Sequence, residues 1–96
     1  MRKPPLALPP AFPWVVATPA ALAALVVANV SPHTLLARHA GSDWGDLDDH
    51  DWQENERALA DVTRLLSAYH LPDGSKVWII TEADRAAATL LLPDEY

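Results

Sequence analysis

The amino-acid sequence predicts an α+β protein in which two or three short N-terminal helices pack on a C-terminal, three-stranded antiparallel β-meander. Two apolar runs flank the tetrapeptide Pro-Asp-Gly-Ser at residues 72–75, whose residue types are those of a tight turn. A third apolar run, residues 87–92, follows a short polar segment, so consecutive strands can pair through local connections. Upstream, Thr18-Pro19 and Ser31-Pro32 each place a helix N-cap residue before a proline, which marks the start of a helix.

The chain divides into an arm and one domain. Residues 1–13 contain five prolines, which remove backbone donors and favour extended conformation, so we expect a disordered proline-rich arm. Residues 14–96 are expected to form a single compact α+β domain. The Trp-Val-Val-Ala segment at residues 14–17 suits a pleated surface and predicts a short extra edge strand.

Three helices are expected before the meander. The first extends from Ala20 to about Ala28, and the second extends to about Ala40 and ends at Gly41 in the left-handed conformation. The third covers residues 47 or 48 to 60, because its first turn is rich in aspartate. Three- and four-residue spacing predicts the apolar faces of these helices, which comprise Leu22, Leu25 and Val26, then Leu35, Leu36 and His39, then Leu47, Trp52 and Leu59.

Composition limits the function. The 96 residues include no cysteine, which excludes disulfides and thiolate metal sites. Thirteen acidic residues against seven Lys and Arg give a net charge of −6, which argues against direct binding of duplex DNA and allows a basic protein partner. The apolar stretch at residues 17–30 is shorter than the ~20 residues of a spanning helix, so we expect a soluble, cytoplasmic protein. Only three glycines are present and no nucleotide-binding loop is found, so no cofactor is predicted.

The first candidate residues are His39, at the end of the second helix, and Thr81 and Arg85, in a separate polar group at one end of the hairpin. His39 titrates near neutrality and could serve as a general acid or base. The guanidinium of Arg85 could hold a phosphate, and Thr81 could position it. The favoured interpretation makes His39 a core histidine that is hydrogen-bonded to the following loop.

A second candidate site is the acidic run of residues 43–56, which holds seven of the thirteen acids. It lacks the pattern of a calcium loop, in which Asp, Asn and Gly alternate before a distant Glu, so no metal site is predicted. Two interpretations stay open, a solvated helix face and a charged docking surface with tryptophan anchors. The candidate binding residues are Asp43, Trp44, Asp46, Asp48, Asp49, Trp52 and Glu56.

Several strings together resemble a known group of proteins. They are Ala-Thr-Pro at 17–19, Leu-Ala-Arg-His at 36–39, Asp-Trp-Gly at 43–45, Leu-Ser-Ala-Tyr at 66–69 and Trp-Ile-Ile-Thr-Glu-Ala-Asp-Arg at 78–85. They resemble the uncharacterised, small plasmid-related proteins of proteobacterial plasmids and integrative elements, over residues 15–96. The resemblance implies a mobile genetic element as the setting, and it implies no mechanism.

Three functions compete at this point. The first is a non-enzymatic protein-binding module that inhibits a host-defence nuclease or nucleoprotein complex. The second is a metal-independent ribonuclease similar to barnase, colicin nucleases or RelE-like toxins, by analogy of fold alone, with His39, Arg85 and Thr81 as catalytic residues. The third is a structural homodimer whose interface buries the four tryptophans, Trp14, Trp44, Trp52 and Trp78.

Overall fold

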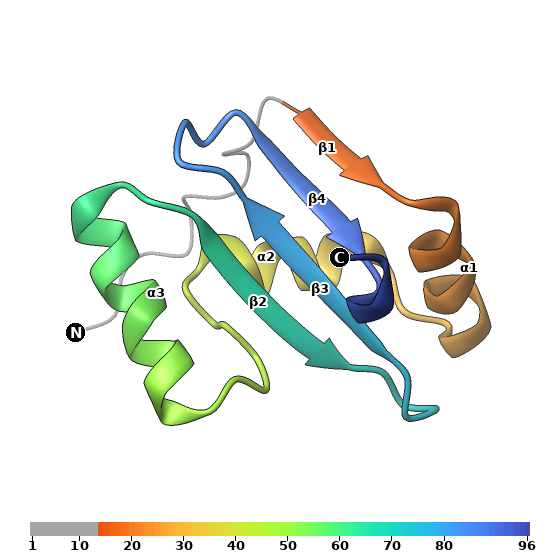
Figure 1. Ribbon diagram of the computed structural model, residues 1–96. Helices are drawn as coiled ribbons and strands as arrows, with labels where there is room; N and C mark the ends of the chain where they lie inside the picture. The colour runs from red at the N-terminus through yellow and green to blue at the C-terminus, as the bar shows by residue number, and fades with distance from the viewer. Residues whose placement is uncertain (1–13) are drawn as a thin grey trace.

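In the computed structural model, which describes residues 14–96, three α-helices pack around a four-stranded mixed β-sheet (Figure 1). The α+β class is therefore confirmed, whereas the predicted arm at residues 1–13 lies outside the described residues. The elements are β1 (Trp14–Ala17), α1 (Pro19–Ala28), α2 (Pro32–Ala40), α3 (Asp49–Asp61), β2 (Leu65–His70), β3 (Lys76–Thr81), β4 (Ala87–Leu91) and the 3₁₀-helix η2 (Pro93–Glu95).

The sheet has the strand order β1-β4-β3-β2. Strands β2, β3 and β4 form the predicted antiparallel meander, and Gly74 takes a positive φ of 93° in the first turn. The predicted extra edge strand at residues 14–17 is confirmed as β1, but it pairs in parallel with β4, so the sheet is mixed and has four strands rather than being a purely antiparallel three-stranded meander. Strand β1 reaches β4 only after three helices and two strands, so no local turn sets its direction.

Helices α1 and α2 pack on the same core as the sheet, and Figure 1 shows α2 behind the strands and α1 beyond the end of β1. Ala21 and Leu25 of α1 and Leu35 of α2 are buried against apolar side chains of β2, β3 and β4. The expectation that Leu22 and Val26 face the core is wrong, since both are exposed. The small Ala21 side chain faces the sheet instead, and this turns Leu22 and Val26 outward.

The helix ends differ from the prediction in detail. Gly41 ends α2 with a φ of −89°, so the expected left-handed glycine is wrong, and Ser42 takes the positive φ of 67° instead. Helix α3 begins at Asp49, one or two residues later than expected, because Asp48 is its N-cap and its side chain accepts the Asp51 N–H. Its buried side chains are Asn55 and Ala58, whereas the predicted core residue Leu59 is exposed.

The opposite face of the sheet carries the C-terminus, drawn in front in Figure 1. Tyr96 makes an edge contact with Trp78 of β3 at 5.8 Å between ring centroids, and Arg64 lies over the Tyr96 ring. Thr18, the N-cap of α1, donates to Glu95 at 2.7 Å, which ties η2 to the start of α1. Within residues 14–96, no single helix is long and apolar enough to cross a membrane; α1 and α2 meet the length only as a pair bent by 106°.

Candidate functional site

The loop of residues 42–48 pairs with the outer edge of β2. Trp44 C=O accepts the Ala68 N–H at 3.1 Å, and Asp46 N–H donates to Ala68 C=O at 2.7 Å. These two bonds form an isolated parallel bridge between Gly45 and Ala68. The segment predicted as a docking surface therefore first serves to cover a strand edge, which otherwise exposes unpaired backbone groups.

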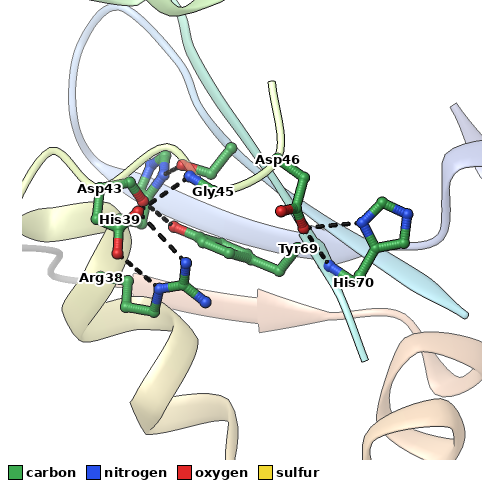
Figure 2. A network of polar contacts seen from close by, with 8 residues as sticks. Arg38, His39, Asp43, Gly45, Asp46, Tyr69 and His70 are labelled. Carbon is green, nitrogen blue, oxygen red and sulfur yellow. Dashed lines mark hydrogen bonds and ion pairs between the residues drawn. The ribbon is translucent and has the colours of Figure 1, made fainter. Parts of the chain in front are cut away.

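Asp43 holds this loop in place through three neighbours (Figure 2). Its carboxylate accepts from Arg38 at 2.7 and 3.3 Å and from the Gly45 N–H at 3.1 Å, and its backbone carbonyl accepts from the Tyr69 hydroxyl at 2.7 Å. The hydrogen bond from Arg38 lowers the pKa of Asp43 and raises that of Arg38. The loop is thereby fixed to both α2 and β2.

Asp46 continues the coverage at the end of β2, where Figure 2 shows it facing His70. Its Oδ2 accepts the His70 backbone N–H at 2.7 Å and lies 2.9 Å from His70 Nδ1. The pKa of Asp46 is lowered, first by the backbone N–H of His70 and then by its ring. The carboxylate of Asp46 therefore takes the place of a neighbouring strand, because it accepts a backbone N–H of β2 that such a strand would otherwise bind.

Asn55 of α3 pairs with the same edge of β2 near the start of the strand, at Leu66. Its amide donates to Leu66 C=O at 2.5 Å and its side-chain oxygen accepts the Leu66 N–H at 3.0 Å. One buried amide thus satisfies both outward backbone groups of a strand residue, as another strand would. The edge cap, defined here as residues 43–46 together with Asn55, serves the three outward-facing residues of β2 (Leu66, Ala68 and His70).

The Trp44 side chain of the edge cap points into the core, and only 1% of the residue's surface is exposed. Its indole N–H donates to Glu56 at 2.8 Å and its ring makes an edge contact with His39 at 5.6 Å. The expectation of an exposed Trp44 anchor is therefore wrong, because the ring fills the space between α3 and β2. Trp52 is half-buried in the same cluster and offers only part of its ring to a partner.

His39 lies in the core between two strands. Its Nδ1 lies 2.5 Å from Ser67 Oγ on β2, and its Nε2 lies 2.8 Å from Thr81 Oγ1 on β3. Each hydroxyl can donate or accept, so the pair suits a neutral imidazole of either tautomer. Burial, with a smaller effect of Arg85, lowers the pKa of His39 to about 4. At neutral pH the ring is uncharged.

Arg85 binds the end of helix α3. Its guanidinium donates to Thr63 C=O at 2.5 Å, to Glu82 C=O at 3.1 Å and to Ala58 C=O at 3.2 Å. The last turn of α3 contains no basic residue of its own, so Arg85 supplies the cation that a helix C-terminus favours. Its backbone φ of 59° is in the left-handed region, which the turn after β3 imposes.

The three candidate catalytic residues do converge. His39 and Arg85 line one cavity of about 210 Å³, and Thr81 contacts the His39 ring. The remaining lining residues are Ala40, Ser42, Trp44, Leu59 and Leu65. Thr81 is fully buried, and all three polar groups bond to the protein itself. This arrangement braces α2, α3 and the sheet against one another.

The acidic side chains of α3 stay on the surface. Asp48, Asp49, Asp51 and Glu56 are exposed, as is Glu54, which pairs with Arg57 at 2.5 Å. Asp48, His50 and Asp51 place ligand atoms within 4.8 Å of one another, but all three are exposed and Asp48 already caps the helix. They form an acidic surface without the features of a dedicated metal site.

Comparison with models of known protein families, with curated protein sequences and with solved structures finds no match to this chain.

Sequence reasoning missed Ser67, Asn55 and Tyr69. Ser67 and Asn55 are polar residues at positions that the strand and helix periods turn inward, and a buried polar residue requires a partner. That pattern could have revealed both. The contact of Tyr69 with the Asp43 carbonyl has no counterpart in local sequence, because 26 positions separate the two residues.

Proposed function

We propose that this protein is a non-enzymatic protein-binding module that docks on a basic partner through the exposed acidic face of α3. One observation carries the proposal. Residues 48–61 hold six carboxylates and one arginine, all exposed, and so account for −5 of the −8 net charge of residues 14–96. Such a surface attracts a basic partner and accelerates the encounter.

The apolar contacts that such a complex needs are available beside the acids. Leu59 and Val62, at the C-terminal end of α3, are exposed by 42% and 57%. They take the place of the tryptophan anchors, because Trp44 is buried. Charge then gives fast association, and these two side chains give desolvated contact area.

The likeness to plasmid-related proteins suggests the partner class. A mobile element gains from blocking a host nuclease or nucleoprotein complex in the cytoplasm, and the nucleic-acid groove of such a complex is basic. An acidic module that occupies this groove is an inhibitor. The non-enzymatic assignment is supported by the bonds that the three residues make within the protein. His39 bonds to Ser67 and Thr81, and Arg85 bonds to backbone carbonyls.

The test is plasmid transformation into hosts with an active restriction nuclease, with and without this protein. We expect wild type to raise transformation efficiency and Asp49→Asn/Glu54→Gln to lose most of that effect. The matched control Glu82→Gln/Asp94→Asn removes two exposed carboxylates outside α3 and should act as wild type. Equal loss in both variants, or no effect of wild type on any class of restriction nuclease, would reject the proposal.

A ribonuclease is the second candidate, because His39 and Arg85 line the same cavity. The assay is cleavage of labelled single-stranded RNA in EDTA by wild type and by His39→Ala, with circular dichroism to verify that both are folded. Cleavage that is lost in His39→Ala would favour the enzyme over the binding module. Absence of cleavage by wild type would reject the ribonuclease hypothesis.

A further inference from the structure

Strand β1 forms one border of the sheet, and among residues 14–96 no strand pairs with its outer side (Figure 1). The Trp14 N–H donates to Ala86 C=O at 3.1 Å and the Thr18 N–H donates to Leu90 C=O at 3.0 Å. Because backbone groups alternate in direction along a strand, the N–H and C=O groups of Val15 and Ala17 point away from β4. Two residues therefore present a template for another strand.

The side chains at this border are apolar and exposed. Trp14 is exposed by 69%, and Val15 and Val16 are each exposed by about half. Helix α1 follows β1 directly and adds Leu22, Val26 and Val27, of which the two valines are more than three-quarters exposed. These six residues, called here the β1–α1 surface, are two-thirds of the nine large hydrophobic residues exposed in residues 14–96.

The β1–α1 surface also lies in the uncharged part of the chain. Residues 14–37 contain no Asp, Glu, Lys or Arg, whereas all thirteen acids and five basic residues of the described part lie in residues 38–96. A basic partner finds no charge to pair with at this surface. A second copy of the chain brings an identical uncharged surface, and it leaves the acidic helices α3 at the far border of each sheet.

We propose that the β1–α1 surface is the interface of a homodimer, in which β1 pairs in antiparallel fashion with β1 of a second copy. A two-fold axis between identical strands makes this pairing self-complementary and joins the two sheets into one. A four-residue strand buries less than the ~800 Å² per partner of a standard interface, so the exposed side chains of α1 supply the remaining contact. This proposal is independent of the proposed partner of α3, which uses another surface.

The interface is narrower than the four-tryptophan dimer that the sequence suggests. Trp14 is exposed, but Trp44 is buried and both Trp52 and Trp78 are half-buried. Residues 1–13 are a poor alternative occupant of the β1 edge, because five of the thirteen are prolines and prolines cannot donate to a strand ladder. A second copy has no proline in the segment that would pair.

The test is sedimentation equilibrium of the full chain from low micromolar to near-millimolar concentration. Wild type should reach twice the monomer mass. Val16→Lys places a charge in the interface and should raise the dissociation constant at least about tenfold. The matched control Val62→Lys is the same change at a similarly exposed valine at the end of α3 and should leave the dimer unchanged. Val15→Pro removes an outward N–H while sparing the β1–β4 bonds, and it should also dissociate the dimer.

Three results would overturn the proposal. The first is a wild-type monomer at every concentration, including one that binds uncharged lipid vesicles in a flotation assay, since that would assign the surface to a membrane. The second is a dimer that withstands both Val16→Lys and Val15→Pro. The third is equal dissociation by Val16→Lys and Val62→Lys, which would place the interface elsewhere. Far-UV circular dichroism of each variant verifies that the monomer remains folded.

Discussion

The two borders of the sheet are treated in opposite ways. At β2, the edge cap of residues 43–46 and Asn55 pairs the outward N–H groups of Leu66, Ala68 and His70 and the C=O groups of Leu66 and Ala68. At β1, nothing within residues 14–96 pairs the outer side, and the side chains there are apolar. Within residues 14–96, the fold therefore closes the β2 edge with its own polar residues and leaves the outer side of β1 without a paired strand.

The buried side chains near the two borders also differ, because polar contacts lie near β2 and apolar contacts lie near β1. Under β2 and β3, His39 joins Ser67 and Thr81 in a buried polar network. Ala21 and Leu25 of α1 instead belong, with Ala88 and Leu90 of β4, to an apolar cluster that contains no histidine and no charged residue. The free energy of unfolding should therefore depend on hydrogen bonds and pH at the β2 border. Changes at Gly45, His39 and Asn55 test this expectation.

The largest effect is expected at Gly45, where the edge cap approaches β2 most closely. A Cβ at Gly45 would overlap the Ala68 carbonyl oxygen and lie 2.6 Å from the Tyr69 ring, at a φ of +78°. Overpacking and strain together should cost about 3 to 4 kcal/mol in Gly45→Ala. The control Gly74→Ala also has a positive φ but meets no atom within 4 Å, so it should cost only about 1 kcal/mol. Similar losses in urea unfolding would show that the cap contributes little.

The second effect is a pH dependence through His39. Its folded pKa of about 4 lies below its ordinary 6.5, so between these values the unfolded chain binds more protons. Stability is then fully present above pH 6.5 and falls as the pH is lowered, by about 2 kcal/mol between pH 7 and 5 and about 3 kcal/mol in total. The measurement is urea unfolding across this range in wild type and in His39→Gln.

The variant His39→Gln should lose most of the slope between pH 5 and 7. The carboxylates Asp43 and Asp46 do not interfere, because lowered pKa values place their contribution below pH 4. NMR titration of the His39 ring in wild type is an independent measurement. A midpoint near 6.5 would contradict a neutral, buried ring.

The third effect concerns Asn55. Asn55→Ala leaves both backbone groups of Leu66 without their partner at the edge of β2 and should cost about 2 kcal/mol in urea unfolding. The control Gln53→Ala, two positions earlier and exposed, should change stability by less than about 0.5 kcal/mol. Equal effects would mean that water replaces the Asn55 amide at no cost.

Much of the fold could be predicted from local patterns. The turn at residues 72–75, the helix starts at Thr18 and Ser31 and the alternation of the strands each depend on neighbouring residues, and all three are found. The convergence of His39, Thr81 and Arg85 was also expected from the ribonuclease analogy. Their roles were not, because the bonds of Arg85 to Thr63 and Ala58 depend on where α3 ends relative to the sheet.

The sequence by itself determined the α+β class, the meander and the separation of residues 14–37, which contain no Asp, Glu, Lys or Arg, from the acidic residues 38–96, because these follow from composition and short-range periodicity. Only the tertiary structure decided that β1 pairs in parallel with β4, that Trp44 is buried and that the acidic loop covers β2. Those outcomes join residues that are far apart in the chain. They depend on which surfaces fit together, and no local pattern encodes that fit.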